Sequence, residues 1–202
     1  IIHLTETLPN DLKSSVKFKI DRNRRSYIES NHTSTHLLHQ ALRNVLGNHV
    51  EQRGSMISDK VFRFDFSHQN KITDAELKSI NDFINDKINQ SIDIIENREE
   101  DYEKAVKNGA IGLFTEKYEE KVRTIKFNDS YELCGGTHVK NTSLISSFKI
   151  ISEGSQAFGI RRIVATSNKE KIIAENLKQK EIKEELDSDS LNKLQKKEIE
   201  LQ

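Results

Sequence analysis

Two short segments carry side chains that together could bind a metal ion. His32 and His36 lie four residues apart in a stretch with helical periodicity, and Cys134 and His138 lie four residues apart around two glycines. Residues at this spacing project from one face of a helix, so both imidazoles can reach one ion. The glycines allow the loop to bring Cys134 and His138 together. Three nitrogens and one sulfur favour zinc over magnesium or calcium.

Each half of this set also has an ordinary explanation. A histidine pair at this spacing is more often part of a helix surface, and a lone cysteine is usually a small buried hydrophobe. The two pairs occur together, however, and Cys134 is the only cysteine of the chain, so we predict one zinc ion. His39 faces the same way as the first pair, either behind the ligands or as an alternative ligand. His3, His49 and His68 are interpreted as solvated or capped side chains.

The residues around the site exclude some enzyme classes. Thr33 follows His32, so the glutamate that acts as general base in His-Glu-x-x-His metalloproteases is missing. The chain has no P-loop, no Rossmann glycine pattern and no Gly-x-Ser-x-Gly motif. Four protein ligands would close a tetrahedral site, which is usual for structural zinc, whereas catalytic zinc keeps a position open. From the residues alone, catalytic zinc, structural zinc and a Cys134 thiol nucleophile are all open.

Three helices are predicted to position these groups. Asn31 is the expected N-cap of a first helix, which stops at Gly47 and carries apolar residues on one face. Thr73 and Glu76 form a capping-box pattern at the start of a second helix. The predicted helices cover about 31–46, 74–90 and 99–107.

Alternating side chains predict several short strands. Val16 to Ile20 alternates apolar and polar residues, and the three phenylalanines between Val61 and Phe66 share one face of a strand. Further strands are expected over 92–95, 121–127, 145–152 and 159–166, the last two joined through the Gly154-Ser155 turn.

Composition narrows the class of protein. The 202 residues include 32 basic and 32 acidic side chains, and 34% are hydrophobic. Zero net charge argues against a general basic surface for nucleic acid, although a local patch can exist. No apolar run approaches the roughly 20 residues that cross a bilayer. A lone cysteine cannot form an internal disulfide, so we expect a cytoplasmic protein.

The sequence changes character after residue 168. From Lys169 to Gln202 it contains no aromatic residue, glycine or proline, and lysine and glutamate dominate. A thin apolar stripe runs through this segment and is interrupted between Asp187 and Ser190. The segment is therefore either a solvated helical tail or part of a helical hairpin or coiled coil.

Five motifs together closely resemble the editing domain of alanyl-tRNA synthetases. They lie in order between about residues 16 and 167, and a combination of five ordered motifs is highly specific. The motifs are Asn31 to His39 (NHTSTHLLH), Gln52 to Ser55 (QRGS), Arg63 to His68 (RFDFSH), Glu132 to Val139 (ELCGGTHV) and Gly159 to Ile163 (GIRRI).

The resemblance implies a fold and a domain organisation. The expected fold is α+β, with an antiparallel sheet packed with helices, partial β-barrel strands at the N-terminus and a helical tail. Residues 1–25 would end a β-barrel subdomain, 26–168 would form the zinc-dependent editing domain, and 169–202 would begin a helical segment through which the family dimerises. The aminoacylation domain, which uses ATP, would lie outside this chain.

The resemblance also implies an activity. It is hydrolysis of the ester in mischarged Ser-tRNA(Ala) or Gly-tRNA(Ala), with the acceptor end of tRNA(Ala) as partner. His32, His36, Cys134 and His138 would be the zinc ligands and the catalytic residues. Two alternatives are a free-standing alanyl-tRNA editing deacylase and a tRNA-binding module whose zinc is structural.

Selectivity for serine over alanine requires a site that reads one hydroxyl group. An unmatched buried polar group costs about 1–3 kcal/mol, so a polar pocket wall can discriminate. By motif position Gln52 is similar to a pocket residue of the family, and Thr33 and Ser55 are further candidates; each could instead be a turn or cap residue. Arg161 and Arg162 point to opposite faces of a strand. Arg162 is the candidate contact to tRNA phosphates, with a surface salt bridge as the alternative.

Overall fold

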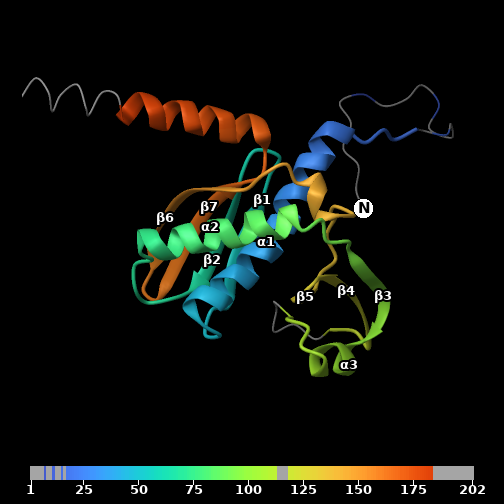
Figure 1. Cartoon of the computed structure of the whole chain (residues 1–202). Coiled ribbons are helices and arrows are strands. Elements are labelled where there is room, and N and C mark those ends of the chain that lie inside the picture. Colours follow the sequence, from blue (N-terminus) through green and yellow to red (C-terminus); the bar gives the residue numbers. More distant parts are fainter. Residues whose placement is uncertain (1–6, 8–10, 12–14, 16, 113–117, 184–202) are drawn as a thin grey trace, which may run out of the picture.

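The fold consists of two antiparallel sheets with helices packed against them (Figure 1). A computed structural model describes residues 7, 11, 15, 17–112 and 118–183. The larger sheet has the strand order β1-β2-β7-β6, and its strands are β1 (Gln52–Ile57), β2 (Phe62–Ser67), β6 (Lys149–Ala157) and β7 (Ile160–Thr166). Two long helices accompany it, α1 (Arg22–Leu46) and α2 (Asp74–Asn89). This architecture confirms the expected α+β class.

The smaller sheet carries the second half of the candidate site. It has the order β3-β4-β5, with β3 (Ile95–Asp101), β4 (Lys121–Phe127) and β5 (Ser130–Leu133), next to the short helices α3 (Tyr102–Lys107) and η1 (Thr142–Leu144). Phe127 pairs with Ser130 across a two-residue turn, in which Asn128 has a φ of 55°. Asparagine tolerates this left-handed conformation, and so tight a turn fixes the register of β5.

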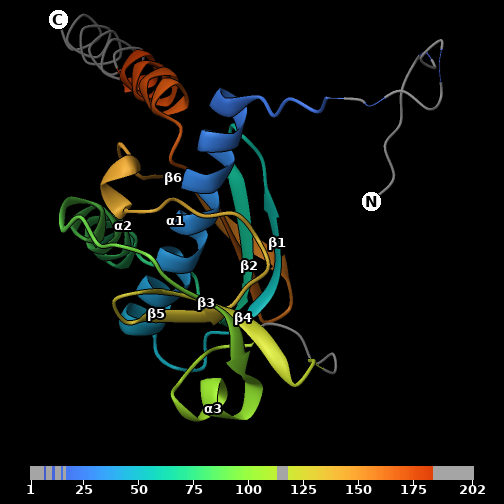
Figure 2. The ribbon, with the colours of Figure 1, turned by 90° about the vertical axis from the view of Figure 1, so that its right-hand side faces the viewer.

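The main core lies between the larger sheet and the two long helices. Phe62, Phe64 and Phe66 are fully buried, because alternate side chains of β2 point to the same face. Helices α1 and α2 lie on the same side of this sheet (Figure 2). This packing fixes the rotation of α1 about its own axis, and with it the direction of the histidines that α1 carries. The helices contribute Leu37, Leu38, Ala41, Leu42, Ile80, Ile84 and Ile88 to the core.

Helix α1 begins well before its predicted start. Its N-cap is Asp21, whose carboxylate accepts a hydrogen bond from the Arg24 N–H at 3.0 Å, and not Asn31. Asn31 is buried inside the helix, where its side-chain amide donates to the Ser58 carbonyl and accepts from the Ser167 N–H. A residue type that often caps helices here links α1 to two distant loops. By contrast, α2 begins at the predicted Thr73 capping box.

The predicted strand over 16–20 is wrong in its described part. Residues 17–20 form no strand, and Val16 lies outside the described residues. Without a partner strand, alternation alone does not create β structure. Helix α1 also passes through residue 25, where a domain boundary was expected. The division into 1–25, 26–168 and 169–202 stays a prediction.

Two further boundaries differ from the predictions. The strand expected over 92–95 begins only at Ile95 and continues to Asp101, so the predicted helix over 99–107 is shortened to α3. The hairpin of β6 and β7 turns at Phe158 and Gly159, not at Gly154-Ser155. Gly159 has a φ of +69° and supplies the left-handed residue that the turn needs, whereas Gly154 pairs within the sheet.

Residues 169–183 form a helix, coloured red in Figure 1. Three of its apolar residues, Ile173, Leu177 and Ile182, are exposed, whereas Ile172 is partly buried. The second half of the predicted tail, 184–202, lies outside the described residues. None of the described helices combines the length and the hydrophobicity needed to cross a membrane.

Candidate metal centre

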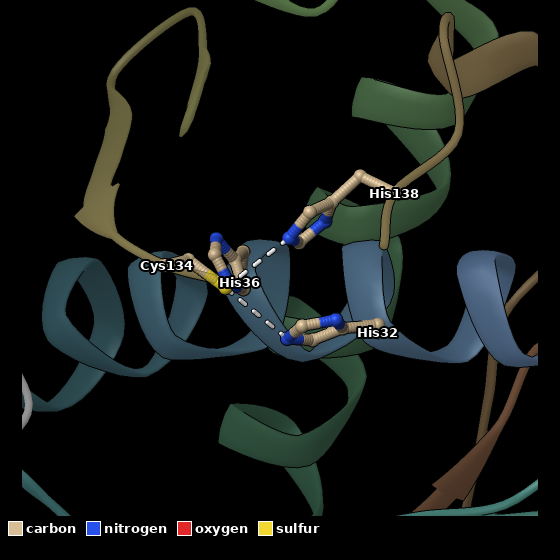
Figure 3. Close-up of side chains that lie close together, drawn as sticks. All are labelled: His32, His36, Cys134 and His138. Carbon is tan, nitrogen blue, oxygen red and sulfur yellow. Dashed lines mark hydrogen bonds between the residues drawn. The ribbon is translucent and has the colours of Figure 1, made fainter. Parts of the chain in front are cut away.

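Four side chains from two distant parts of the sequence meet beside α1 (Figure 3). They are His32 and His36 on α1 and Cys134 and His138 in the loop that follows β5. One potential ligand atom from each lies within 4.8 Å of all the others. The structure thus brings together the four residues that the sequence singled out. We call them the ligand group.

Backbone contacts hold the loop of the ligand group in place. The Cys134 N–H donates to the Arg123 carbonyl at 3.1 Å. The Arg123 guanidinium donates in return to the carbonyls of Cys134 and Gly136, at 2.7 and 2.6 Å. Gly136 lies directly against His32, since a Cβ at this position would be 2.0 Å from the His32 Cε1. Only glycine therefore fits there, whereas a Cβ on Gly135 would meet nothing within 4 Å.

In two of the histidines one ring nitrogen is held by an oxygen and the other faces the thiol. The His32 Nδ1 lies 3.1 Å from the Thr137 carbonyl, and its Nε2 lies 3.5 Å from the Cys134 Sγ. The His138 Nδ1 lies 3.2 Å from the Thr33 Oγ1, and its Nε2 lies 3.3 Å from the same sulfur. A proton on each Nδ1 leaves the Nε2 lone pair for a metal ion.

The third histidine shows most directly that the group fits a metal ion. The His36 Nε2 lies 3.6 Å from a Glu132 carboxylate oxygen. Its Nδ1 is buried and has no hydrogen-bond partner among the described residues. A buried polar atom without a partner is costly, and a bound cation would satisfy it. Three imidazole nitrogens and one sulfur suit a borderline-soft ion such as zinc.

The buried surroundings keep the imidazoles uncharged. Burial lowers the pKa of His36 to about 3, although the Glu132 carboxylate opposes this, and burial and the neighbouring His32 lower the pKa of His138 to about 2. Burial is also the main cause of the lowered pKa of His32, and it raises the pKa of the Cys134 thiol. At neutral pH the imidazoles are in the form that binds metals, and a bound ion would displace the thiol proton.

A buried carboxylate behind the ligand group is a residue that sequence reasoning missed. Glu132 contacts His36 and accepts a hydrogen bond from the His39 Nδ1 at 3.0 Å. His39 thus lies behind the ligands, bound to Glu132, and is not a member of the ligand group. Its position in the sequence could have indicated this role. Glu132 lies two residues before Cys134 at the end of a strand, and side chains two apart share a face.

The predicted substrate contacts divide into two sets. Thr33 adjoins the ligand group, where its hydroxyl meets the His138 Nδ1 and accepts from the Val139 N–H at 3.2 Å. Gln52 and Ser55 lie on β1, and the Gln52 amide donates to the Ser55 hydroxyl at 3.1 Å.

Arg162, the predicted phosphate contact, and its neighbour Arg161 form ion pairs on the larger sheet. Arg162 forms a bidentate pair with Asp65 at 2.6 and 2.7 Å, and Arg161 pairs with Glu153. In this structure both arginines therefore form salt bridges, which was the alternative to a phosphate contact.

The remaining histidines lie elsewhere. His49 and His68 form a hydrogen-bonded pair at the surface, with 2.9 Å between Nε2 and Nδ1. They are not part of the ligand group. His3 lies outside the described residues.

Comparison with known proteins places the chain in a class and then in a family. Residues 122–164, which run from β4 to β7 and include Cys134 and His138, match the family described as "Threonyl and Alanyl tRNA synthetase second additional domain". The chain therefore carries a domain of the kind that these two synthetases share. Relatives that match four fifths or more of the chain are alanine–tRNA ligases, so the chain belongs to the alanine–tRNA ligase family.

Individual relatives support this assignment over most of the chain. An alanine–tRNA ligase from Cytophaga hutchinsonii is 53% identical over 167 residues, which is 82% of this chain and 19% of the relative. One from Christiangramia forsetii is 51% identical over 165 residues, again 82% of this chain and 19% of the relative. One from Thermoanaerobacter pseudethanolicus is 49% identical over 190 residues, 93% of this chain and 21% of the relative. The chain thus spans about a fifth of the length of these relatives.

Proposed function

We propose that this chain performs the editing reaction of an alanyl-tRNA synthetase. The reaction is hydrolysis of the ester that links serine or glycine to tRNA(Ala), at a site that holds one zinc ion. The observation that carries this proposal is the convergence of His32, His36, Cys134 and His138 at one point. The family supports a role on tRNA, and the neutral imidazoles support metal binding.

The ligand group would hold zinc through the sulfur and one nitrogen of each histidine. A bound ion would supply Lewis acidity, which polarises an ester carbonyl or lowers the pKa of a water molecule. The chain itself orients the ligands: Thr137 and Thr33 hold two of the histidine rings, and Arg123 holds the loop backbone. The ester is already activated, so a positioned water and a stabilised oxyanion suffice for hydrolysis.

Discrimination against alanine would come from polar groups that read the serine hydroxyl. Thr33 lies beside His138, and the Gln52 amide with the Ser55 hydroxyl forms a second polar pair on β1. Thr33 is fully buried, and a buried polar group that loses its partner when alanine binds costs about 1–3 kcal/mol; Gln52 is half-buried and Ser55 is exposed. We assign these three residues to substrate recognition. Arg162 would meet a tRNA phosphate only if its pair with Asp65 opens.

The proposal also covers the partner, the cellular location and the oligomeric state of the protein. The partner is the acceptor end of tRNA(Ala), the protein acts in the cytoplasm, and attachment of alanine with ATP takes place in a separate aminoacylation domain. The segment 169–202 contributes to a homodimer through its apolar stripe, of which Ile173 and Leu177 are exposed.

A second candidate function follows from the number of ligands. Four protein donors lie within 4.8 Å of one another, and four ligands close the tetrahedral shell that zinc prefers in structural sites. In that case the chain is a tRNA-binding module stabilised by zinc. The two functions differ in what metal removal does, because a structural ion supports the fold and a catalytic ion supports the reaction.

The test compares the same substitution inside and outside the ligand group. We expect purified protein to contain zinc and to hydrolyse Ser-tRNA(Ala), and His32→Ala to lose both properties. The surface variant His49→Ala should retain them. Wild-type deacylation by His32→Ala after metal removal would contradict the catalytic role of the site. Loss of cooperative unfolding on metal removal would favour the structural-zinc module.

A further inference from the structure

A buried carboxylate connects two histidines behind the ligand group. Only 3% of the Glu132 side chain is exposed, with 3% of His36 and 1% of His39. Moving a carboxylate out of water costs several kcal/mol unless it is paired and hydrogen-bonded. Neither the family match nor the zinc ligands assign a role to this acid, so its burial needs an explanation.

The hydrogen-bonding capacity of the three groups leaves little freedom. An ionised carboxylate only accepts hydrogen bonds, and a neutral imidazole has one N–H donor and one acceptor nitrogen. The Glu132 Oε1 lies 3.0 Å from the His39 Nδ1, and the Oε2 lies 3.6 Å from the His36 Nε2. The second distance is slightly longer than a hydrogen bond. The His39 Nδ1 therefore carries a proton, and the negative charge near the His36 Nε2 favours a proton on that nitrogen.

This proton placement determines which nitrogen of His36 can bind a metal ion. With the proton on Nε2, the lone pair is on Nδ1, which is buried and lacks a partner among the described residues. With the opposite tautomer, Nδ1 would carry the proton and offer no lone pair, and the Nε2 lone pair would face a carboxylate. Carboxylates behind metal-binding histidines fix tautomer and ring orientation in this way.

His39 completes the arrangement from the other side. Its Nδ1 donates to Glu132, and its ring packs against Phe64 with 5.4 Å between the ring centroids. Phe64 is fully buried in β2, so the core holds the His39 ring in place. Without His39, one oxygen of a buried carboxylate would lose its only described hydrogen bond.

We propose that Glu132 is a positioning residue that holds His36 in the tautomer with a free Nδ1 lone pair, and that His39 holds Glu132. The inference depends on the metal site of the proposed function and adds two residues to it. Neither residue needs to touch the substrate, because both act through His36.

Nitrogen NMR of the metal-free wild-type protein, labelled with ¹⁵N-histidine, tests the tautomer directly. We expect His36 to carry its proton on Nε2 and His39 to carry its proton on Nδ1. A His36 ring with its proton on Nδ1 would overturn the proposal. This measurement needs no variant and no tRNA, so it decides the question even where a variant fails to fold.

Zinc affinity, measured by competition with a chelator, tests the consequence. Glu132→Gln keeps the size of the side chain but offers one acceptor and one donor, so it cannot accept from both rings. We expect its zinc affinity to fall by about 10- to 100-fold. The control Asp129→Asn removes the same charge from an exposed side chain in the same hairpin, and should bind zinc like the wild type. Equal affinity of Glu132→Gln and Asp129→Asn would overturn the proposal.

The role of His39 predicts non-additivity. If His39 acts through Glu132, a double variant that also carries His39→Gln should lose no more affinity than Glu132→Gln alone. Independent, additive losses would overturn the assignment of His39. A wild-type protein that binds no zinc would instead contradict the proposed function itself, so the two failures are distinguishable.

Discussion

Gly136 shows how one residue controls the ligand group. A Cβ at this position would lie 2.0 Å from the His32 Cε1 and 2.5 Å from its Nδ1, the nitrogen held by the Thr137 carbonyl. Two atoms cannot approach so closely, so any side chain must displace the His32 ring. The adjacent Gly135 faces open space and provides a matched position.

We predict that Gly136→Ala loses zinc and that Gly135→Ala keeps it. Loss of a side chain that supports a metal ligand lowers metal affinity by about 10- to 100-fold, and we expect Gly136→Ala to lower zinc affinity by at least as much. Elemental analysis and chelator competition measure the effect, and thermal unfolding shows whether both variants fold. Zinc binding by Gly136→Ala at the wild-type level would show that His32 is not a ligand.

At the scale of elements, the site depends on how the β5 loop is held against β4. The Arg123 Nη1 donates to the carbonyls of Cys134 and Gly136, while its Nε donates to Glu96 at 2.8 Å. One guanidinium thus donates hydrogen bonds to Cys134, Gly136 and Glu96 at once, which a lysine ammonium on a flexible stem cannot reproduce. The loop carries Cys134 and His138, so its position sets half of the ligand group.

We predict that Arg123→Lys lowers zinc affinity without unfolding the protein. A hydrogen bond to a charged group contributes about 1.5–3 kcal/mol, so affinity should fall by roughly 10- to 100-fold where two such bonds are weakened. The control is Arg98→Lys, because Arg98 also pairs with Glu96 but is exposed and does not hold the loop. Equal zinc affinity in the two variants would contradict the role of Arg123.

At the scale of the whole molecule, the ligand group joins a helix of the main core to the loop that follows β5. The main core joins α1 and α2 to the larger sheet and includes Ile125 and Phe127 of β4, while α3, β4 and β5 share a smaller apolar cluster around Ala105 and Val122. Two ligands come from α1 and two from the loop after β5. A bound ion would therefore connect the loop after β5 to a helix of the main core.

We predict that metal removal loosens β5 and the loop that follows it, and leaves the main core folded. The core around Phe62, Phe64 and Phe66 buries its apolar residues without the ligands. Hydrogen exchange with and without a chelator should therefore show faster exchange in β5 and the loop that follows it, and unchanged protection in β2 and β7. Loss of protection in β2 and β7 as well would contradict this prediction.

The tail gives a prediction about association. Exposed apolar side chains on the helix over 169–183, namely Ile173 and Leu177, have no core to cover them. We expect the chain to dimerise with rising concentration in analytical ultracentrifugation, and Leu177→Lys to sediment as a monomer. A wild-type chain that stays monomeric at high concentration would show that this segment does not suffice for dimerisation.

The sequence alone predicted the donor residues of the candidate site and most elements. The donor types and spacings of His32, His36, Cys134 and His138 indicated a metal site, and the apolar periodicity of α2 and β2 predicted those elements because it is a local property. The start of α1 could not be predicted in this way, since Asn31 uses its amide for tertiary hydrogen bonds.

The tertiary structure decided what depends on contacts between distant segments. It paired Arg162 with Asp65, turned β6 into β7 at Gly159, and brought Glu132 and His39 together behind His36. Sequence spacing shows which side chains share a face of one helix or strand. Which faces meet is set by the packing of β5 against α1, so the partner of a buried carboxylate emerges only when the two elements are in contact.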